Sequence, residues 1–274
     1  MSKRKIIAKA FPSTKRTNSS LSGKIKNPEL QSILNNIPEA NFNWNIKEAV
    51  NHLVTSDERF IKVITDHGIP DHYLKTSNML NSDDYFLELI KIIIYQQLAP
   101  TAAEKIAERF FDSIKLKGNQ LVTPDIILKL KFEVDIIDGK RKILLFGNPT
   151  GLSEAKSKYI KSLAEHFNDP TKLKDVDLNA LSDSELVEKL TAVNGLGLWT
   201  VHMFVIFNLK RSNVLAYGDL GIRNGITSFY GLPKKYLEGK SNIKEIESLC
   251  SNWAPYSSLA CSLMWKIADK DKKK

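Results

Sequence analysis

The stretch TAVNGLGLWTVHMF at residues 191–204 places two glycines, two positions apart, inside an apolar pattern that has helical spacing. Before the glycines, Ser182 and Glu185 stand at the spacing of a capping box, which predicts a helix over about 183–193. After the glycines the apolar positions continue and predict a second helix. The stretch therefore predicts a helix–hairpin–helix over about 183–208.

Gly195 and Gly197 give the predicted hairpin properties that other residues would not. Glycine tolerates positive φ, and its missing side chain lets another molecule approach the backbone. The amides that begin the second helix can also bind a phosphate oxygen. The alternative is an ordinary turn between two helices with glycine at a helix end, and Gly-x-Gly by itself favours this alternative. The choice depends on the rest of the chain.

Helical spacing dominates the chain on both sides of the hairpin. Apolar residues recur every three or four positions from about residue 44 onward. Asn81 or Ser82 can cap a helix that has an acidic first turn, and Pro100 is suited to begin the next helix. Ser153 can cap a further helix. These signals predict an all-α fold.

One segment departs from the helical pattern. Asp138 and Gly139 lie between two apolar runs, and this arrangement is typical of a type I′ turn. We therefore expect a small β-hairpin over residues 132–147.

Composition limits the class of protein. The chain has 274 residues, 42% of them hydrophobic, which is ample for one or two domains with sizeable cores. Its apolar runs are short, as at residues 92–94, so we expect no membrane span. The basic N-terminus lacks a following apolar segment and is unlike a secretory signal, so we expect an intracellular protein.

Cysteine and histidine usage predicts no required cofactor. Cys250 and Cys261 are too few for a disulfide framework, a four-thiolate zinc site or a four-cysteine iron–sulfur site. We expect them to be small core residues. None of the five histidines stands at a metal-ligand spacing such as H-x-x-x-H.

The net charge of +9 is concentrated at the ends of the chain. Residues 1–40 and 266–274 together hold 13 of the 40 basic residues and 4 of the 31 acidic residues. This leaves 27 residues of each sign in 41–265. We expect a mostly disordered basic tail over 1–40, a folded domain over 41–265 and a basic tail over 266–274. Such tails can attract phosphates, solubilise a protein or target it. The basic stretch SKRKIIAK resembles a nuclear localisation signal, so we expect a nuclear protein if the source is eukaryotic. Otherwise we expect the protein in the cytoplasm or nucleoid.

Residues 190–226 resemble the helix–hairpin–helix DNA glycosylase superfamily, which orders its elements as hairpin, helix, loop with a fixed aspartate, and helix. Asp219 stands at the position of that aspartate. Further stretches are similar to the alkylated-base branch, the 3-methyladenine DNA glycosylases of the bacterial inducible type and their fungal relatives. These stretches are IIIYQQLAPTAAEKIAERF at 92–110, GLSEAKSKYIKSLA at 151–164 and WAPYSSLACSLMWKIAD at 253–269. The resemblance extends over about residues 44–268.

Two features depart from the family. The expected hairpin at 132–147 is longer than the usual connection, and we expect an added surface feature there. Ser257 stands where the family commonly has arginine, which puts one phosphate or structural contact in doubt.

The resemblance implies a two-lobed, all-α helix–hairpin–helix glycosylase. Such an enzyme flips alkylated bases, such as 3-methyladenine and 7-methylguanine, out of duplex DNA and hydrolyses the N-glycosidic bond in base excision repair. We expect a monomer whose partner is damaged double-stranded DNA. Two rival functions are a non-catalytic helix–hairpin–helix module that binds DNA or a partner, and a glycosylase for deaminated or oxidised bases.

Asp219 is the expected catalytic residue. Breaking an N-glycosidic bond gives the sugar oxocarbenium character, which a carboxylate can stabilise while it orients or deprotonates water. The alternative role is to cap the following helix, and one aspartate can do both.

Trp199 leads the candidates for the base pocket, by resemblance, because an alkylated purine is cationic and favours an electron-rich ring. Tyr95, Trp253 and Tyr256 are weaker candidates, and burial in the core is the alternative for Trp199. Lyase members of the superfamily carry a lysine at this position that forms a Schiff base with the sugar. Tryptophan cannot form it, so we expect no AP lyase activity.

The expected DNA-binding residues lie in two segments. By resemblance Leu98 is a wedge that fills the space of the flipped base, although a leucine at a helix junction can also be buried. Gln96 and Gln97 can bond to bases or to the DNA backbone, or cap the junction. In the hairpin the expected contacts are Gly195, Leu196, Gly197 and Thr200.

A monovalent cation is also implied by family correspondence. Its ligands would be the backbone carbonyls of Thr191, Val193 and Leu196, and it would help to orient the phosphate-binding turn. We expect no divalent metal, because the five histidines show no ligand spacing.

Overall fold

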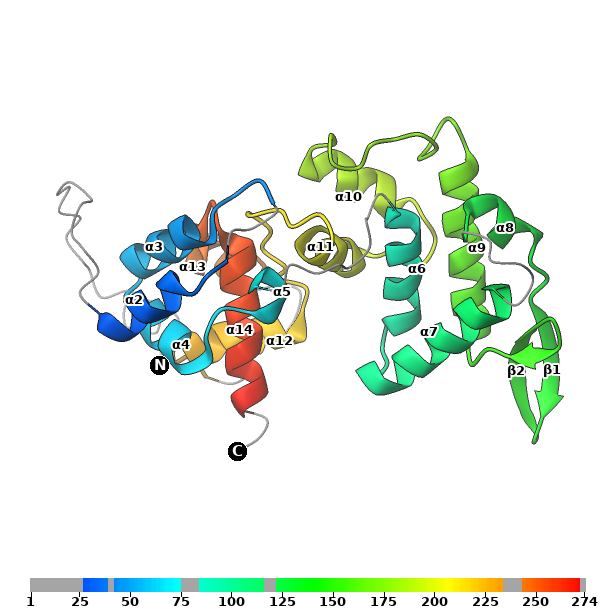
Figure 1. The fold of residues 1–274 in the computed structure, drawn as a ribbon, viewed down its shortest axis with the longest axis horizontal. Helices are drawn as coiled ribbons and strands as arrows, with labels where there is room; N and C mark the ends of the chain where they lie inside the picture. Colours follow the sequence, from blue (N-terminus) through cyan, green and yellow to red (C-terminus); the bar gives the residue numbers. More distant parts are fainter. Residues whose placement is uncertain (1–26, 39–41, 75–83, 116–121, 234–242, 272–274) are drawn as a thin grey trace. The chain divides into compact units, whose positions relative to one another are not determined.

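The computed structural model describes residues 27–38, 42–74, 84–115, 122–233 and 243–271. The chain divides into two compact units, each with its own set of helices (Figure 1). Unit 1 combines Met1–Ser77 with Lys210–Lys274, and unit 2 spans Asn78–Leu209. Among the described residues, none of the helices is both long enough and apolar enough to cross a bilayer.

Unit 2 is mostly helical, as the sequence predicts. Its elements are α6 Tyr85–Tyr95, α7 Pro100–Lys115, α8 Pro124–Lys129, β1 Glu133–Ile137, β2 Lys140–Leu145, β3 Asn148–Pro149, α9 Glu154–Asn168, α10 Asp183–Thr191 and α11 Leu198–Phe207. Helix α6 packs against α7, α9 and α11, and α8 packs against α9. Leu89, Ile90, Ile93 and Ile94 of α6 are fully buried, at the spacing that places them on one helical face.

The expected β-hairpin is present and belongs to a three-stranded antiparallel sheet in the order β1-β2-β3. Ile137 pairs with Lys140, and the two residues between them, Asp138 and Gly139, have φ values of 53° and 69°. Positive φ at both central residues is the requirement of a type I′ turn, so this prediction is confirmed. The third strand was not predicted.

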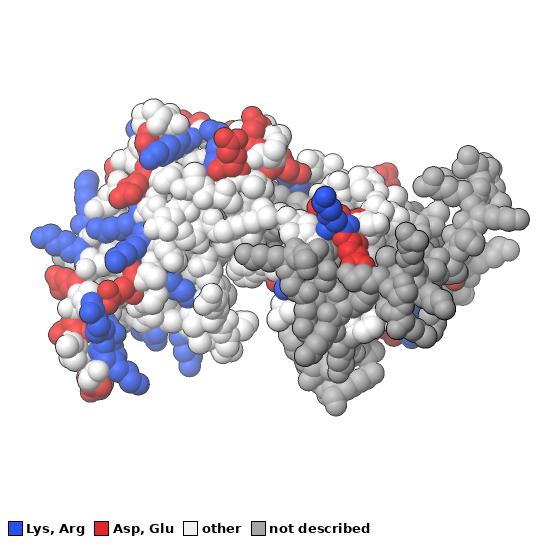
Figure 2. All heavy atoms as spheres, turned by 180° about the vertical axis from the view of Figure 1, so that it is seen from behind, with Lys and Arg blue, Asp and Glu red and all other residues white. Residues whose placement is uncertain are grey.

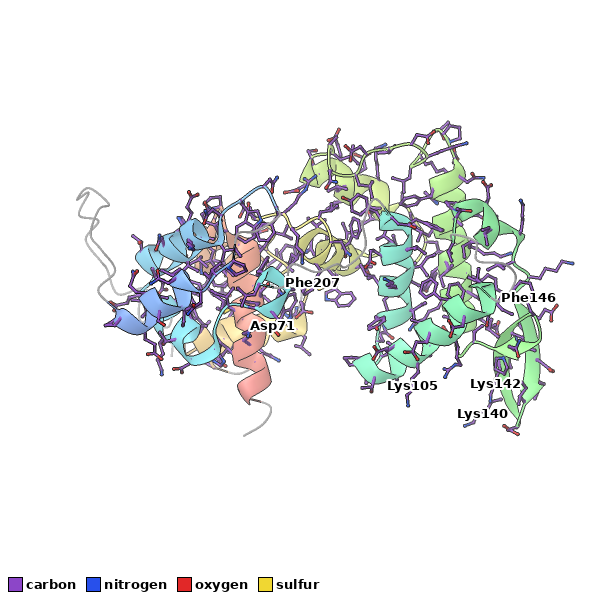
Figure 3. The ribbon with its side chains drawn as sticks, viewed as in Figure 1. Asp71, Lys105, Lys140, Lys142, Phe146 and Phe207 are labelled. Carbon is purple, nitrogen blue, oxygen red and sulfur yellow. The ribbon has the colours of Figure 1, made fainter. Side chains whose placement is uncertain are left out.

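Burial increases along strand β2. Lys140 and Arg141 are exposed, whereas Ile143, Leu144 and Leu145 are buried, and β2 packs against α9. Lys140 and Lys142 lie in the half of β2 nearer the turn and extend from the hairpin (Figure 3). The hairpin therefore attaches to unit 2 by the buried side chains at one end of β2.

Two of the predicted helix starts are confirmed, and a third is corrected. Pro100 begins α7, and the Ser153 hydroxyl accepts the amide of Lys156 as the cap of α9. Helix α6 is capped by Asp84, whose Oδ1 accepts the Leu87 amide at 3.1 Å. Asp84 stands directly before the first helical residue, and its carboxylate is therefore within reach of that amide. The expected caps Asn81 and Ser82 lie outside the described residues.

Unit 1 combines an N-terminal and a C-terminal segment of the chain. Its elements are α2 Pro28–Asn35, α3 Ile46–Ser56, α4 Arg59–His67, α5 Asp71–Leu74, α12 Leu220–Phe229, α13 Ile243–Leu249, the 3-10 helix η2 Ser251–Trp253 and α14 Ser257–Asp271. Helix α14 packs against α12 and α4, and α3 packs against η2. A side chain at Gly225 of α12 would lie 2.2 Å from the Met264 carbonyl oxygen, so this glycine permits the close packing of α12 on α14.

Part of each expected tail is helical. Residues 28–35, which lie inside the expected tail 1–40, form α2, and Leu30 and Leu34 are buried. Helix α14 continues through residue 271 into the expected tail 266–274, and Lys266 Nζ donates to the His67 carbonyl at 2.9 Å. In α2, Leu30 and Leu34 stand at helical spacing, and their burial outweighs the polar composition around them. Residues 1–26 and 272–274 lie outside the described residues.

Acidic and basic side chains are intermixed on the face of unit 2 drawn in Figure 2, where this unit is on the left. Unit 2 contains ion pairs between such side chains: Arg141 Nε lies 2.6 Å from Glu154 Oε1, and Lys172 Nζ lies 3.2 Å from Asp169 Oδ2. This mixture agrees with the equal numbers of the two signs in residues 41–265.

Candidate functional site

The predicted helix–hairpin–helix is present in unit 2. Helix α10 begins with the capping box of Ser182 and Glu185, and α11 begins at Leu198 with Gly197 as its N-cap. Val193 and Leu196 are buried and anchor the turn, and the Leu196 amide donates to the Val193 carbonyl at 3.1 Å. The first amides of a helix have no partner inside that helix, so the start of α11 presents donors that suit an anion.

The two glycines of the hairpin differ in structure. Gly195 has a φ of +90°, and a Cβ at this position would lie 2.1 Å from Cγ of Tyr159 on α9. Gly197 has a φ of −85°, and a Cβ there would meet nothing within 4 Å. Conformation and packing both require glycine at Gly195, whereas the fold imposes no such requirement at Gly197.

The junction between α6 and α7 contains the predicted wedge. Leu98 is 39% exposed, so the alternative of a buried leucine is wrong. Gln97 is exposed and has a φ of +55°, which is uncommon for a residue other than glycine. Gln96 instead faces the protein, and its Nε2 donates to the Gly195 carbonyl at 2.9 Å and to Thr200 Oγ1 at 3.1 Å.

Gln96 therefore connects the junction to the hairpin. Neither its partners nor the burial of Thr200, which is 3% exposed, follows from the local sequence. The expected DNA contact of Thr200 is corrected in part, because its hydroxyl is an acceptor for Gln96 inside the protein.

Two of the expected pocket residues present aromatic surface in unit 2. Trp199, at the start of α11, is 38% exposed, so the alternative of a core tryptophan is wrong. Tyr95, the last residue of α6, is 40% exposed. Partial burial, together with the carboxylates of Glu104 and Glu108, raises the pKa of the Tyr95 hydroxyl. This hydroxyl therefore stays protonated at neutral pH and is able to donate a hydrogen bond.

Trp253 is not available to a base, which corrects the expectation for this residue. Its side chain is fully buried in unit 1, with ring centroids 5.9 Å from Phe60, 6.3 Å from Phe229 and 6.4 Å from Tyr230. The short helix η2 turns the chain so that this tryptophan enters the core. It supports the fold through a large buried apolar surface.

Tyr256, the remaining pocket candidate, is half-buried in unit 1. Its ring centroid lies 5.5 Å from the His52 ring and 5.9 Å from the Trp44 ring. It thus belongs to an aromatic group separate from the one that buries Trp253.

Asp219 caps α12, as one of the two interpretations predicts. Its Oδ1 accepts the Ile222 amide at 2.9 Å and also the indole Nε1–H of Trp265 on α14 at 2.7 Å. Two donors hold one carboxylate oxygen and so restrict the rotation of the side chain. Capping therefore orients this carboxylate and is compatible with a catalytic role.

Gly221 makes room for the Trp265 indole beside Asp219. A Cβ on Gly221 would lie 2.8 Å from Trp265 Cδ1 and 3.1 Å from Asp219 Oδ1. The sequence reasoning missed Trp265, since 46 positions separate the tryptophan from the aspartate. The one available signal was its place in the WAPYSSLACSLMWKIAD stretch.

Cys261 is a buried residue of α14. Burial raises the pKa of the Cys261 thiol to about 12, and the Asp219 carboxylate acts in the same direction. The thiol therefore stays neutral, and both cysteines are core residues, as predicted.

Ser257, which replaces the family's arginine, is buried and donates to Asn213 Oδ1 at 2.8 Å, so it makes a contact inside unit 1.

The candidate residues thus form two groups, one in each unit. Unit 2 brings together the wedge junction and the hairpin through Gln96, and it carries Trp199. Unit 1 carries Asp219 with Trp265.

Comparisons with known proteins identify the family. A profile of the HhH-GPD superfamily of base excision DNA repair proteins matches residues 90–255. DNA-3-methyladenine glycosylase 1 of Schizosaccharomyces pombe is 33% identical over 220 residues, which cover 79% of this chain and 85% of that protein. DNA-3-methyladenine glycosylase of Saccharomyces cerevisiae is 30% identical over 246 residues, which cover 80% and 79%.

A solved structure shares the fold. The Schizosaccharomyces pombe 3-methyladenine DNA glycosylase in complex with abasic DNA superposes with a TM-score of 0.61 and 30% identity. The match covers 80% of this chain and 95% of the other. The hairpin, the loop aspartate and these relatives all lead to the same assignment: the chain belongs to the HhH-GPD superfamily of base excision DNA repair proteins.

Proposed function

We propose that this protein is a DNA glycosylase that excises alkylated bases, of the 3-methyladenine and 7-methylguanine type, from duplex DNA in base excision repair. The observation that carries the proposal is the Asp219 carboxylate, held by the Trp265 indole and by the start of α12. Relatives with this function cover most of the chain, and one of them is known in complex with abasic DNA.

In this proposal Asp219 acts on the sugar. As the N-glycosidic bond breaks, positive charge develops on the anomeric carbon and ring oxygen, and a fixed carboxylate stabilises it. The same carboxylate orients or deprotonates the water that adds to the sugar. An alkylated purine already carries a positive charge and leaves as a neutral base, so the reaction has little need of a general acid.

In this proposal Trp199 contacts the base, and its presence in place of a lysine excludes the lyase reaction. Its exposed indole offers an electron-rich face to a cationic purine. It carries no amine that could attack the sugar and form a Schiff base. We therefore propose a monofunctional enzyme that leaves an intact abasic strand.

The hairpin and the junction bind the damaged strand. The amides at the start of α11 suit a phosphate, and the exposed Leu98 and Gln97 suit insertion into the duplex beside the flipped nucleotide. Unstacking the base costs a few kcal/mol, which the inserted side chain offsets in part. The basic tails add non-specific attraction to phosphates.

A monovalent cation fits the hairpin's donor set. Thr191, Val193 and Leu196 supply neutral carbonyl oxygens within six residues, and the Val193 carbonyl already accepts the Leu196 amide at 3.1 Å. A carbonyl has a second lone pair, so this bond leaves it able to act as a ligand. A cation held there would add positive charge beside the phosphate-binding amides.

One experiment tests the function. DNA treated with a methylating agent is incubated with the full-length protein, the released bases are separated by chromatography, and the strands are examined with and without alkali. Release of 3-methyladenine or 7-methylguanine, with breaks only after alkali, is expected. Release of no base would support a binding module instead, and breaks without alkali would contradict the monofunctional mechanism.

Replacing Trp265 with phenylalanine is expected to slow excision about 10- to 100-fold, because the indole donor that orients Asp219 is lost. A hydrogen bond to a charged group contributes about 1.5–3 kcal/mol, so the variant also unfolds more easily. The measurement is the single-turnover rate of base release, with the affinity for abasic DNA measured in parallel and expected to be unchanged.

The matched control for Trp265 is Tyr230→Phe. This change removes another buried hydrogen bond of unit 1, from the Tyr230 hydroxyl to the Leu249 carbonyl at 2.7 Å, at the opposite end of α12 from Asp219. It is expected to lower stability by about 0.5–1.5 kcal/mol, because the acceptor is neutral, and to leave the rate intact. Equal losses of rate in the two variants would assign Trp265 a purely structural role.

A further inference from the structure

Helix α9 contacts both of the segments that face DNA in the proposed function. Lys156, Tyr159 and Ser162 follow one another at three-residue intervals, which places them on one side of the helix. Their partners are the junction after α6 and the turn of the hairpin. One rigid element therefore sets the position of both segments.

Lys156 holds the junction. Its Nζ donates to the carbonyl of Ile94 at 2.8 Å and to the carbonyl of Gln96 at 2.8 Å. These carbonyls belong to the end of α6, where the last turn has no partners inside the helix and the helix dipole favours a cation. Burial lowers the pKa of the Lys156 amine.

Tyr159 and Ser162 hold the hairpin. The ring of Tyr159 occupies the space that a side chain on Gly195 would need, and the Asn194 amide donates to Ser162 Oγ at 3.2 Å. Gln96 completes the connection, because its side chain donates to the Gly195 carbonyl while its own carbonyl accepts from Lys156.

The backbone after Gln96 explains why the junction needs such support. Gln97 has positive φ, a conformation that a residue other than glycine keeps only when its surroundings impose it. The bond from Lys156 to the Gln96 carbonyl fixes the peptide group directly before Gln97. This conformation in turn sets the direction of Leu98, which is exposed one residue later.

We propose that Lys156 is a positioning residue that holds the wedge Leu98 in register with the phosphate-binding hairpin. The wedge then enters the duplex at the nucleotide whose phosphate the hairpin binds. This proposal rests on the proposed function, because it assigns Lys156 a part in flipping the base and none in breaking the bond.

The test compares two lysines of the same helix. Lys156→Met removes the two bonds to the junction, whereas Lys158→Met removes the same charge from an exposed position of α9. Three quantities are measured on the full-length protein: base release from methylated duplex DNA in a single turnover, affinity for abasic duplex DNA, and fluorescence of 2-aminopurine placed beside the lesion.

Lys156→Met is expected to slow release from duplex DNA about 10- to 100-fold, since a misplacement of about 1 Å in a positioned group can cost that much. The fluorescence change that reports flipping is expected to shrink by the same measure. Affinity for abasic DNA, which has no base to displace, is expected to stay near that of wild type. Lys158→Met is expected to match wild type in all three measurements, and Lys156→Arg to recover part of the rate.

A double-mutant cycle with Leu98→Ala shows whether Lys156 acts through the wedge. If it does, adding Lys156→Met to Leu98→Ala causes little further loss of rate. Additive losses would overturn the proposal, and so would wild-type flipping in Lys156→Met. Should Lys156→Met fail to fold, Lys156→Gln replaces it in the same cycle. A wild-type protein that releases no alkylated base contradicts the proposed function rather than this assignment.

Discussion

Replacing Asp219 with asparagine is expected to lower the rate of base release at least about 1000-fold, because the charge that stabilises the oxocarbenium-like sugar is removed. Asparagine is the informative choice, since it caps helices about as well as aspartate. Its side-chain oxygen can still accept from the Ile222 amide and the Trp265 indole, so α12 and α14 are expected to keep their packing.

Three measurements separate the roles of Asp219. The single-turnover rate is expected to fall, while the affinity for abasic DNA and the unfolding temperature stay close to those of wild type. Asp219→Ala serves as the contrast, because it removes both the cap and the acceptor of the Trp265 indole and is expected to cost about 2–4 kcal/mol of stability. If Asp219→Asn lost rate and DNA affinity together, or kept its rate, the catalytic assignment would be wrong.

The second large effect is expected at Gly195, where alanine should destabilise the protein by about 2–4 kcal/mol. The φ of +90° is unfavourable for a residue with a side chain, and the new methyl group would overlap the Tyr159 ring, 2.1 Å from its Cγ. Relief of that overlap requires the hairpin or α9 to move. DNA affinity is therefore expected to fall together with the unfolding temperature.

Gly197→Ala is the matched control in the same turn. Its φ of −85° suits any residue, and a methyl group there has open space around it. Thermal unfolding of this variant is expected to match wild type. If DNA needs the close approach that glycine permits, DNA affinity alone falls in Gly197→Ala. Equal destabilisation of the two variants would contradict the difference that we draw between the glycines.

The confirmed predictions concern features that depend on residues close together in the sequence. The capping box of Ser182 and Glu185, the start of α7 at Pro100 and the type I′ turn at Asp138 and Gly139 each depend on a few adjacent positions. Local hydrogen bonds and steric limits act over that range, and a sequence displays them directly. The order of hairpin, helix and aspartate was instead recognised by its resemblance to the glycosylase superfamily.

Other features depend on contacts between distant residues. Trp199 and Trp253 were both expected in the base pocket, yet one is 38% exposed and the other fully buried. Which of them enters a core depends on how many apolar neighbours the fold supplies, and the three rings around Trp253 come from α4 and the end of α12.

The sequence by itself determined most of the helices and the hairpin, and its resemblance to the glycosylase superfamily singled out Asp219. The tertiary structure decided that only Gly195 of the two hairpin glycines is constrained and that Gln96 faces inward. It also decided that Trp265 donates to Asp219 and that Lys156 donates to the junction after α6. Each of these depends on a partner 36 to 99 positions away along the chain. Spacing in a sequence reports the faces of one element, whereas only the packing of elements brings such partners to within hydrogen-bonding distance.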